Sequence, residues 1–204
     1  MALCDLGTVH QAAGQLDAAR SKYEEALKYS PAYGLPVFNL GVLAAALGDE
    51  DAATRLYSRA VALNPSHVEA YHNLGLQHGK AGDLSASIAC FERAVAVNPN
   101  SEVTAQCLAV ALAQRGSARC GAGDMEAGLA CYHRALGYNA KCPEAHFNLG
   151  VAYTGLAAAA LAASGRGGVT GGGEGPSGVA EAGEAEAVGE GGDSSSSAAA
   201  LAAA

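Results

Sequence analysis

Four glycines recur along the chain, and each is followed by a second glycine seven residues later. The pairs are Gly7/Gly14, Gly41/Gly48, Gly75/Gly82 and Gly116/Gly123. The first members of the first three pairs are 34 residues apart. A fixed interval of this length indicates a stack of similar units, each of which buries its apolar face only against its neighbours. The glycines therefore predict a repeat array rather than one globular core.

The residues that follow each glycine define a helix-turn-helix unit. A large aromatic residue comes 16 positions after each leading glycine, as Tyr23, Tyr57, Phe91 and Tyr132. A Gly-Asp turn at residues 48–49, 82–83 and 123–124 combines a residue that ends one helix with a residue that caps the next. Pro31, Pro65 and Pro99 then stop the second helices. This pattern is typical of tetratricopeptide repeats (TPRs), so we predict an all-α fold, a right-handed superhelix of TPR units.

The spacing predicts where the units begin and end. We expect units at about 1–33, 34–67, 68–101 and 102–142, then an incomplete unit at 143–156. From Gly75 to Gly116 the interval is 41 residues, and the seven extra residues are close to two helical turns. They predict a lengthened first helix from about Glu102 to Arg119.

The last part of the sequence, residues 157–204, has low complexity. It consists mainly of Ala, Gly, Ser and Glu and contains no aromatic residue. Such a segment cannot offset a backbone ordering entropy of about 1–2 kcal/mol per residue, so we expect a disordered tail. Solenoids need polar terminal repeats, and neither end shows one. We therefore expect the sequence to be a fragment or truncated product of a longer repeat protein.

Composition narrows the classes of function. The chain has 20 acidic and 12 basic residues, and this balance argues against a nucleic-acid partner. Its six cysteines form no CxxC pair, and its six histidines show no zinc-like spacing, so we expect reduced structural thiols and no metal or cofactor. We find no signal sequence and no apolar run of about 18 residues. These features predict a protein of the cytoplasm and nucleus without a membrane partner.

The units also resemble the TPR region of SPINDLY-type protein O-glycosyltransferases, plant relatives of the nucleocytoplasmic O-GlcNAc transferase. The likeness is carried by residues 2–31, 70–100 and, most specifically, 131–153, with the sequence CYHRALGYNAKCPEAHFNLGVAY. It implies transfer of one sugar from UDP-GlcNAc or GDP-fucose to Ser or Thr of nuclear and cytosolic proteins, and a role in gibberellin signalling. The catalytic domain of that family is missing here, so no residue is given a catalytic role.

Asparagine precedes Leu-Gly in three units, as Asn39, Asn73 and Asn148. A primary amide can donate to and accept from a peptide backbone without reading its sequence. This arrangement is similar to the asparagine ladder of O-GlcNAc transferases, which implies that the three residues bind extended polypeptide segments. The alternative is that they are solvated or hydrogen-bonded locally. His72 and His146 lie close to the same predicted wall and are further candidates for partner contact.

Two other functions are compatible with a TPR array. A co-chaperone clamp that holds an acidic C-terminus needs Lys or Arg one residue before and three after the asparagine. Those positions instead hold uncharged residues, namely Phe38, Val42, His72, Leu76, Phe147 and Val151. The remaining alternative is a stand-alone scaffold whose repeats associate with one another.

Overall fold

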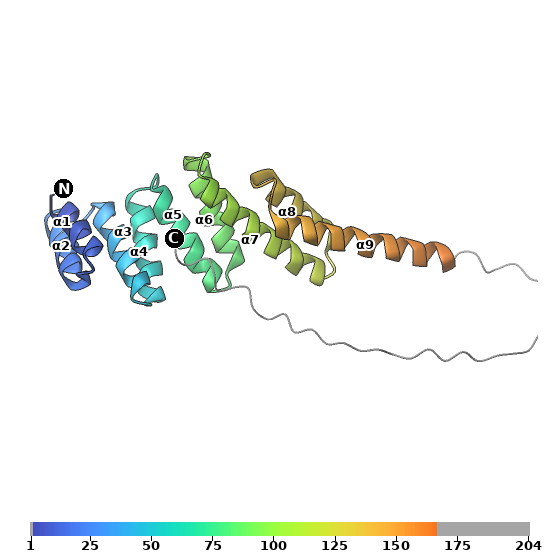
Figure 1. Cartoon of the computed structure of the whole chain (residues 1–204), viewed down its shortest axis with the longest axis horizontal. Coiled ribbons are helices and arrows are strands. Elements are labelled where there is room, and N and C mark those ends of the chain that lie inside the picture. The colour runs from blue at the N-terminus through green and yellow to red at the C-terminus, as the bar shows by residue number, and fades with distance from the viewer. Residues whose placement is uncertain (1, 167–204) are drawn as a thin grey trace, which may run out of the picture. The chain divides into compact units, whose positions relative to one another are not determined.

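The computed structural model describes residues 2–166, and all of its regular structure in that range is helical. The helices are α1 (Ala2–Ala12), α2 (Leu16–Tyr29), α3 (Gly34–Ala46), α4 (Glu50–Leu63), α5 (Val68–Lys80), α6 (Leu84–Val97), α7 (Glu102–Gly121), α8 (Met125–Tyr138) and α9 (Pro143–Arg166). The helix pairs α1/α2, α3/α4, α5/α6 and α7/α8 follow one another along the array (Figure 1). This arrangement confirms the predicted all-α TPR fold.

Within each pair, an aromatic ring of the second helix packs against the leading glycine of the first. A Cβ atom at Gly41 would lie 2.7 Å from the ring of Tyr57, and one at Gly75 would lie 2.7 Å from the ring of Phe91. The four rings that lie against these glycines are at most 3% exposed. Glycine is therefore required at these positions because any larger residue would occupy the space of the ring.

The turn within each unit forms as the Gly-Asp dipeptides predict. Gly48, Gly82 and Gly123 have φ angles of 80°, 80° and 87°, a region that favours glycine. Asp83 caps α6, because its side chain accepts a hydrogen bond of 2.9 Å from the backbone N–H of Ala86. The equivalent aspartates cap α4 and α8. Each cap satisfies a backbone donor that the helix leaves without a partner.

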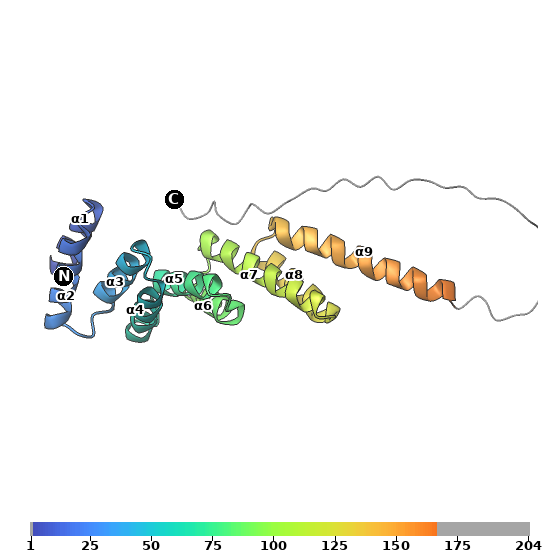
Figure 2. The same ribbon diagram turned by 90° about the horizontal axis from the view of Figure 1, so that it is seen from below.

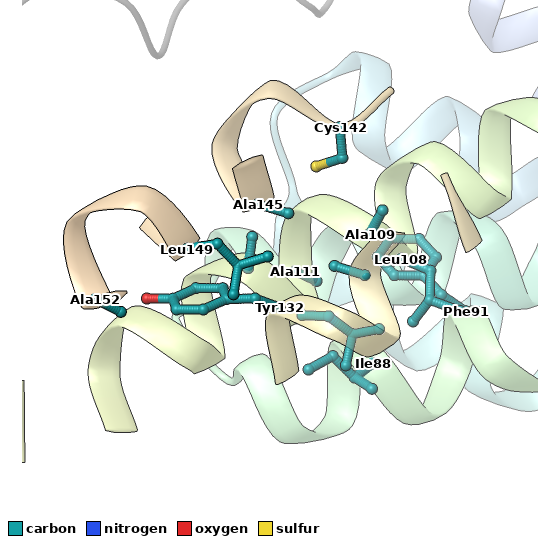
Figure 3. Packing of buried hydrophobic residues seen from close by; sticks show 13 residues of the cluster. Ile88, Phe91, Leu108, Ala109, Ala111, Tyr132, Cys142, Ala145, Leu149 and Ala152 are labelled. Atoms are coloured by element: carbon teal, nitrogen blue, oxygen red, sulfur yellow. The ribbon is translucent and has the colours of Figure 1, made fainter. Parts of the chain in front are cut away.

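The second helix of one unit packs against the first helix of the next, which joins the pairs into one array (Figure 2). The helix that we expected from about Glu102 to Arg119 runs from Glu102 to Gly121, so the additional residues lengthen α7. Apolar residues of α7, among them Leu108 and Leu112, lie in a core with Tyr132 of α8 and Leu149 of α9 (Figure 3).

The helix α9 corrects two expectations from the sequence. It continues to Arg166, so the disordered tail does not begin at residue 157, because the alanines that follow Leu156 favour helix. The segment Pro143–Ser164 is also long and apolar enough to cross a membrane by length and composition, with a mean hydropathy of 1.3. A search for an uninterrupted apolar run missed it because polar residues such as Glu144 interrupt the segment. The rest of the expected tail, residues 167–204, lies outside the described residues.

Candidate functional site

A pocket of about 330 Å³ lies where the first helices of the second, third and fourth units come together. It is lined by Phe38 of α3, by Val68, Glu69, His72 and Asn73 of α5, by Asn98 and Ser101 of the loop after α6, and by Val103 and Thr104 of α7. The lining therefore combines apolar and hydrogen-bonding side chains. Such a lining can hold both the side chains and the backbone of a bound polypeptide.

A short hydrogen-bonded network fixes one wall of the pocket. His72 Nδ1 lies 3.1 Å from Thr104 Oγ1, which is in turn 2.9 Å from Ser101 Oγ. Burial lowers the pKa of His72, and the nearby Glu69 carboxylate acts in the opposite direction. The imidazole is therefore uncharged at neutral pH and joins α5 to α7 through neutral hydrogen bonds.

Glu69 gives the pocket a negative charge. Its carboxylate is 3.1 Å from His67 Nδ1, and its side chain is 71% exposed. The ring of His67 packs against Phe38, with 4.6 Å between the ring centroids. No lysine or arginine is among the residues that line the pocket. The site therefore lacks the cations with which a clamp would hold an acidic C-terminus.

Of the three asparagines that the sequence analysis selected, Asn73 is the one that lines this pocket. Each of the three also binds the preceding unit. Asn39 Nδ2 donates to Cys4 Sγ at 3.6 Å, and Asn148 Nδ2 donates to Ser117 Oγ at 3.0 Å. Asn73 forms a hydrogen bond with the side chain of Tyr57. Burial raises the pKa of Tyr57 to about 12, and this hydrogen bond acts in the opposite direction. A primary amide has two donor hydrogens and one acceptor oxygen, so its hydrogen-bonding capacity exceeds the one bond that each asparagine makes to the preceding unit.

The sequence analysis missed several residues of the pocket, including Glu69, Val103 and Thr104. Two of these residues, Glu69 and Val103, could be found from the sequence, because each comes four residues after the proline that ends the preceding unit. Leu35 has the same position after Pro31. A count back from the leading glycine would not find Val103, since the extra residues of α7 lie between it and Gly116. Of the two histidines selected, His72 lines the pocket, whereas His146 Nε2 bonds the backbone oxygen of Ala140 at 2.9 Å.

The cysteines have the environment of structural thiols. Burial raises the pKa of Cys4, Cys90, Cys107 and Cys142, so these thiols stay protonated at neutral pH. Within the part of the chain that the structure describes, no group of three or more His, Cys, Asp or Glu residues is placed to hold a metal ion.

Solved structures of other proteins share this fold. The chain is similar to MamA, with 22% identity over 74% of this chain and 84% of that protein and a TM-score of 0.55. It is similar to YrrB, described as a TPR protein with an unusual peptide-binding site, with 16% identity, coverage of 74% and 75% of the two chains and a TM-score of 0.59.

A third similar structure is an O-GlcNAc transferase of Thermobaculum terrenum, with 27% identity and a TM-score of 0.50. The match covers 54% of this chain but 21% of that enzyme. No match was found among the curated proteins.

Models of the tetratricopeptide repeat match residues 4–68 and 113–176, and a related model matches residues 68–101. Together they cover most of the sequence, including α2 to α6, α8 and α9, and residues 102–112 of α7 lie between the matches. The chain belongs to the tetratricopeptide repeat family.

Proposed function

We propose that the chain is a protein-binding platform whose pocket between α3, α5 and α7 holds an extended polypeptide segment. The observation that carries the proposal is the position of Asn73, which lines the pocket next to His72, the residue that is hydrogen-bonded to Thr104. Its amide keeps a donor and an acceptor for a peptide backbone, while Phe38, Val68 and Val103 supply apolar contact for side chains.

The fold and its neighbours support this proposal. TPR arrays form extended surfaces that bind other proteins, and YrrB is described as having a peptide-binding site. The lining of the pocket favours a segment without acidic residues, since it includes the carboxylate side chain of Glu69 and no lysine or arginine. A co-chaperone clamp for an acidic terminus is correspondingly less well supported.

A more specific proposal is that this platform is the substrate-recognition arm of a SPINDLY-type protein O-glycosyltransferase. Support comes from the sequence likeness of residues 131–153 and from the structural similarity to the Thermobaculum terrenum O-GlcNAc transferase. In this proposal Asn39, Asn73 and Asn148 contact substrates of the cytoplasm and nucleus. The sugar transfer is assigned to a catalytic domain that the arm serves.

Peptide selection tests the binding proposal. Twelve-residue peptides selected from a random library on the full chain would be measured by fluorescence anisotropy against the wild type and Asn73→Ala. A hydrogen bond contributes about 0.5–1.5 kcal/mol net, so loss of two contacts, about 1–3 kcal/mol, predicts a decrease in affinity of about 5- to 150-fold. The control is Tyr29→Ala, a highly exposed residue of α2 that does not line the pocket. Equal affinity of all selected peptides for Asn73→Ala would contradict the proposal.

A chimera tests the glycosyltransferase proposal separately. Residues 2–156 would replace the TPR arm of a full-length SPINDLY-type enzyme, and modification of intact protein substrates would be compared with modification of short peptides. The proposal predicts that the chimera modifies proteins and that Asn73→Ala reduces this activity without changing the activity on short peptides. A chimera that modifies only short peptides would contradict the role as a substrate arm while leaving the pocket proposal untouched.

A further inference from the structure

The helix α9 has one buried face and one exposed apolar face. Ala145, Leu149 and Ala152 are buried in the core with Tyr132 (Figure 3). On the opposite side, Phe147, Val151 and Leu161 are 73%, 56% and 73% exposed. Because these three residues recur at spacings that place them on one side of a helix, they form a continuous surface, which we call the α9 outer face.

Gly150 lies beside this face and has a particular relationship to the rest of the array. In the four preceding units, the leading glycine lies against an aromatic ring of its own second helix, so that a Cβ atom at Gly116 would be 2.6 Å from Tyr132. Gly150 occupies the same place in the frame of α9, after Asn148 and Leu149. Yet, apart from its chain neighbours and the adjacent backbone of α9, no atom of the described residues lies within 4 Å of a Cβ atom built there.

We propose that α9 binds, in trans, an amphipathic helix of a partner protein, and that an aromatic side chain of this helix packs against Gly150. The structure shows the corresponding interface four times, at α1/α2, α3/α4, α5/α6 and α7/α8. The α9 outer face repeats part of that interface, because Phe147 and Val151 take the positions of Phe38 and Val42, which pack against the core around Tyr57 in the second unit. It is therefore a fifth copy of an established interface without its second helix.

The four second helices define the chemistry of the partner. Each has a small residue four positions before the aromatic residue and an alanine three positions after it. The sets are Ala19/Tyr23/Ala26, Ala53/Tyr57/Ala60, Ser87/Phe91/Ala94 and Gly128/Tyr132/Ala135. The small residues let the helix backbones approach closely enough for the ring to reach the glycine. The partner helix should therefore have the pattern small-x3-aromatic-x2-small.

Besides the four second helices, the pattern occurs in α3, as Gly34, Phe38 and Gly41, and all of these helices already pack within their own units. Residues 167–204 contain no aromatic residue. In α9 itself, Tyr153 is flanked at these positions by the bulky Leu149 and Leu156, so the α9 helix of a second copy is a poor substitute. The structure therefore favours a different protein over self-association as the source of the helix.

The proposal can be tested with a peptide that copies α4. A fluorescent peptide of residues 49–64 would be titrated with the full chain, and the matched control peptide would have Tyr57→Ala. We expect the control peptide to bind at least tenfold more weakly. Gly150→Leu in the chain should abolish binding, whereas Gly137→Leu, at a glycine of α8 that also has open space around it, should not. Circular dichroism would show that both variants keep their helix content.

Three results would overturn the proposal. The first is no binding of the α4 peptide, or equal binding of the two peptides. The second is a dimer of the wild-type chain in light scattering that Gly150→Leu dissociates, since the occupant would then be a second copy. The third is binding of the chain to vesicles of phosphatidylcholine and phosphatidylserine that the α4 peptide does not compete with, since the α9 outer face would then serve a membrane.

Discussion

The side chain of Asn148 on α9 donates a hydrogen bond of 3.0 Å to Ser117 Oγ on α7, and Ser117 Oγ lies 3.1 Å from the hydroxyl of Tyr132 on α8. This series of contacts joins α9 to the preceding helix pair. A residue that we selected as a ligand contact therefore also has a structural role, as Asn39 and Asn73 do at their own unit boundaries.

Replacing Asn148 should loosen α9. The loss of the hydrogen bond to Ser117 predicts a destabilisation of α9 docking by about 0.5–1.5 kcal/mol in Asn148→Ala. Amide hydrogen exchange of α9 should become faster, while exchange of α1 to α4 should not change. Thr154→Ala is the control, because Thr154 bonds only the backbone oxygen of Val151 within α9. Equal exchange rates in the two variants would show that the contact does not hold α9.

Two glycine substitutions should have opposite effects. Gly75→Ala places a Cβ atom 2.7 Å from the Phe91 ring, and overpacking of this kind costs about 1–3 kcal/mol. Gly150→Ala meets open space in a helix and should stabilise the chain by about 0.5–1 kcal/mol through helix propensity. Urea denaturation followed by circular dichroism measures both changes. The interpretation of the glycines fails if Gly75→Ala is as stable as the wild type.

The helix caps permit another comparison. Asp83→Ala removes the side chain that accepts from Ala86, and loss of such a cap costs about 1 kcal/mol. Gln15→Ala is the control for the N-cap position, because Gln15 makes no side-chain cap hydrogen bond to α2; its Oε1 instead lies 2.6 Å from His10 Nδ1 in α1. Thermal unfolding should show a lower midpoint for Asp83→Ala and a smaller change for Gln15→Ala. Equal shifts would mean that the cap bond adds nothing.

Tyr57 should make the chain sensitive to alkaline pH. Burial raises its pKa from 10.0 to about 12, so the folded state favours the neutral phenol. A raised folded-state pKa gives stability that is present below pH 10 and is lost as the pH rises from about 10 to about 12. Urea midpoints across this range should therefore fall, and they should fall less steeply in Tyr57→Phe. An identical pH dependence in both proteins would contradict this assignment.

Much of the fold could be predicted from the sequence because each local signal agreed with the repeat. The aspartates of the Gly-Asp turns cap the second helices, and the second helices end before the prolines. The aromatic residues pack against the leading glycines. The start of the tail could not be predicted from low complexity alone, since alanines extend α9 to Arg166. Their helix propensity outweighed the lack of a packing partner.

The pocket could be predicted only in part. Asn73 and His72 were selected from their place in the repeat, but Thr104 and Val103 were not, because the additional residues of α7 changed the count from the glycine. The bonds of Asn39 and Asn148 to the preceding units depend on how successive units pack. That packing is a tertiary property, and neither propensity nor spacing reports it.

The most direct test of the binding proposal is site-specific photocrosslinking to a selected peptide. A benzophenone side chain would replace Val103, which lines the pocket and is 65% exposed, or Tyr29, which does not line it and is 80% exposed. The account predicts that the peptide crosslinks at position 103 and that unlabelled peptide competes with this reaction, while position 29 gives no crosslink. Crosslinking at position 29 alone, or to the same extent at both positions, would contradict the claim that the pocket between α3, α5 and α7 binds polypeptide.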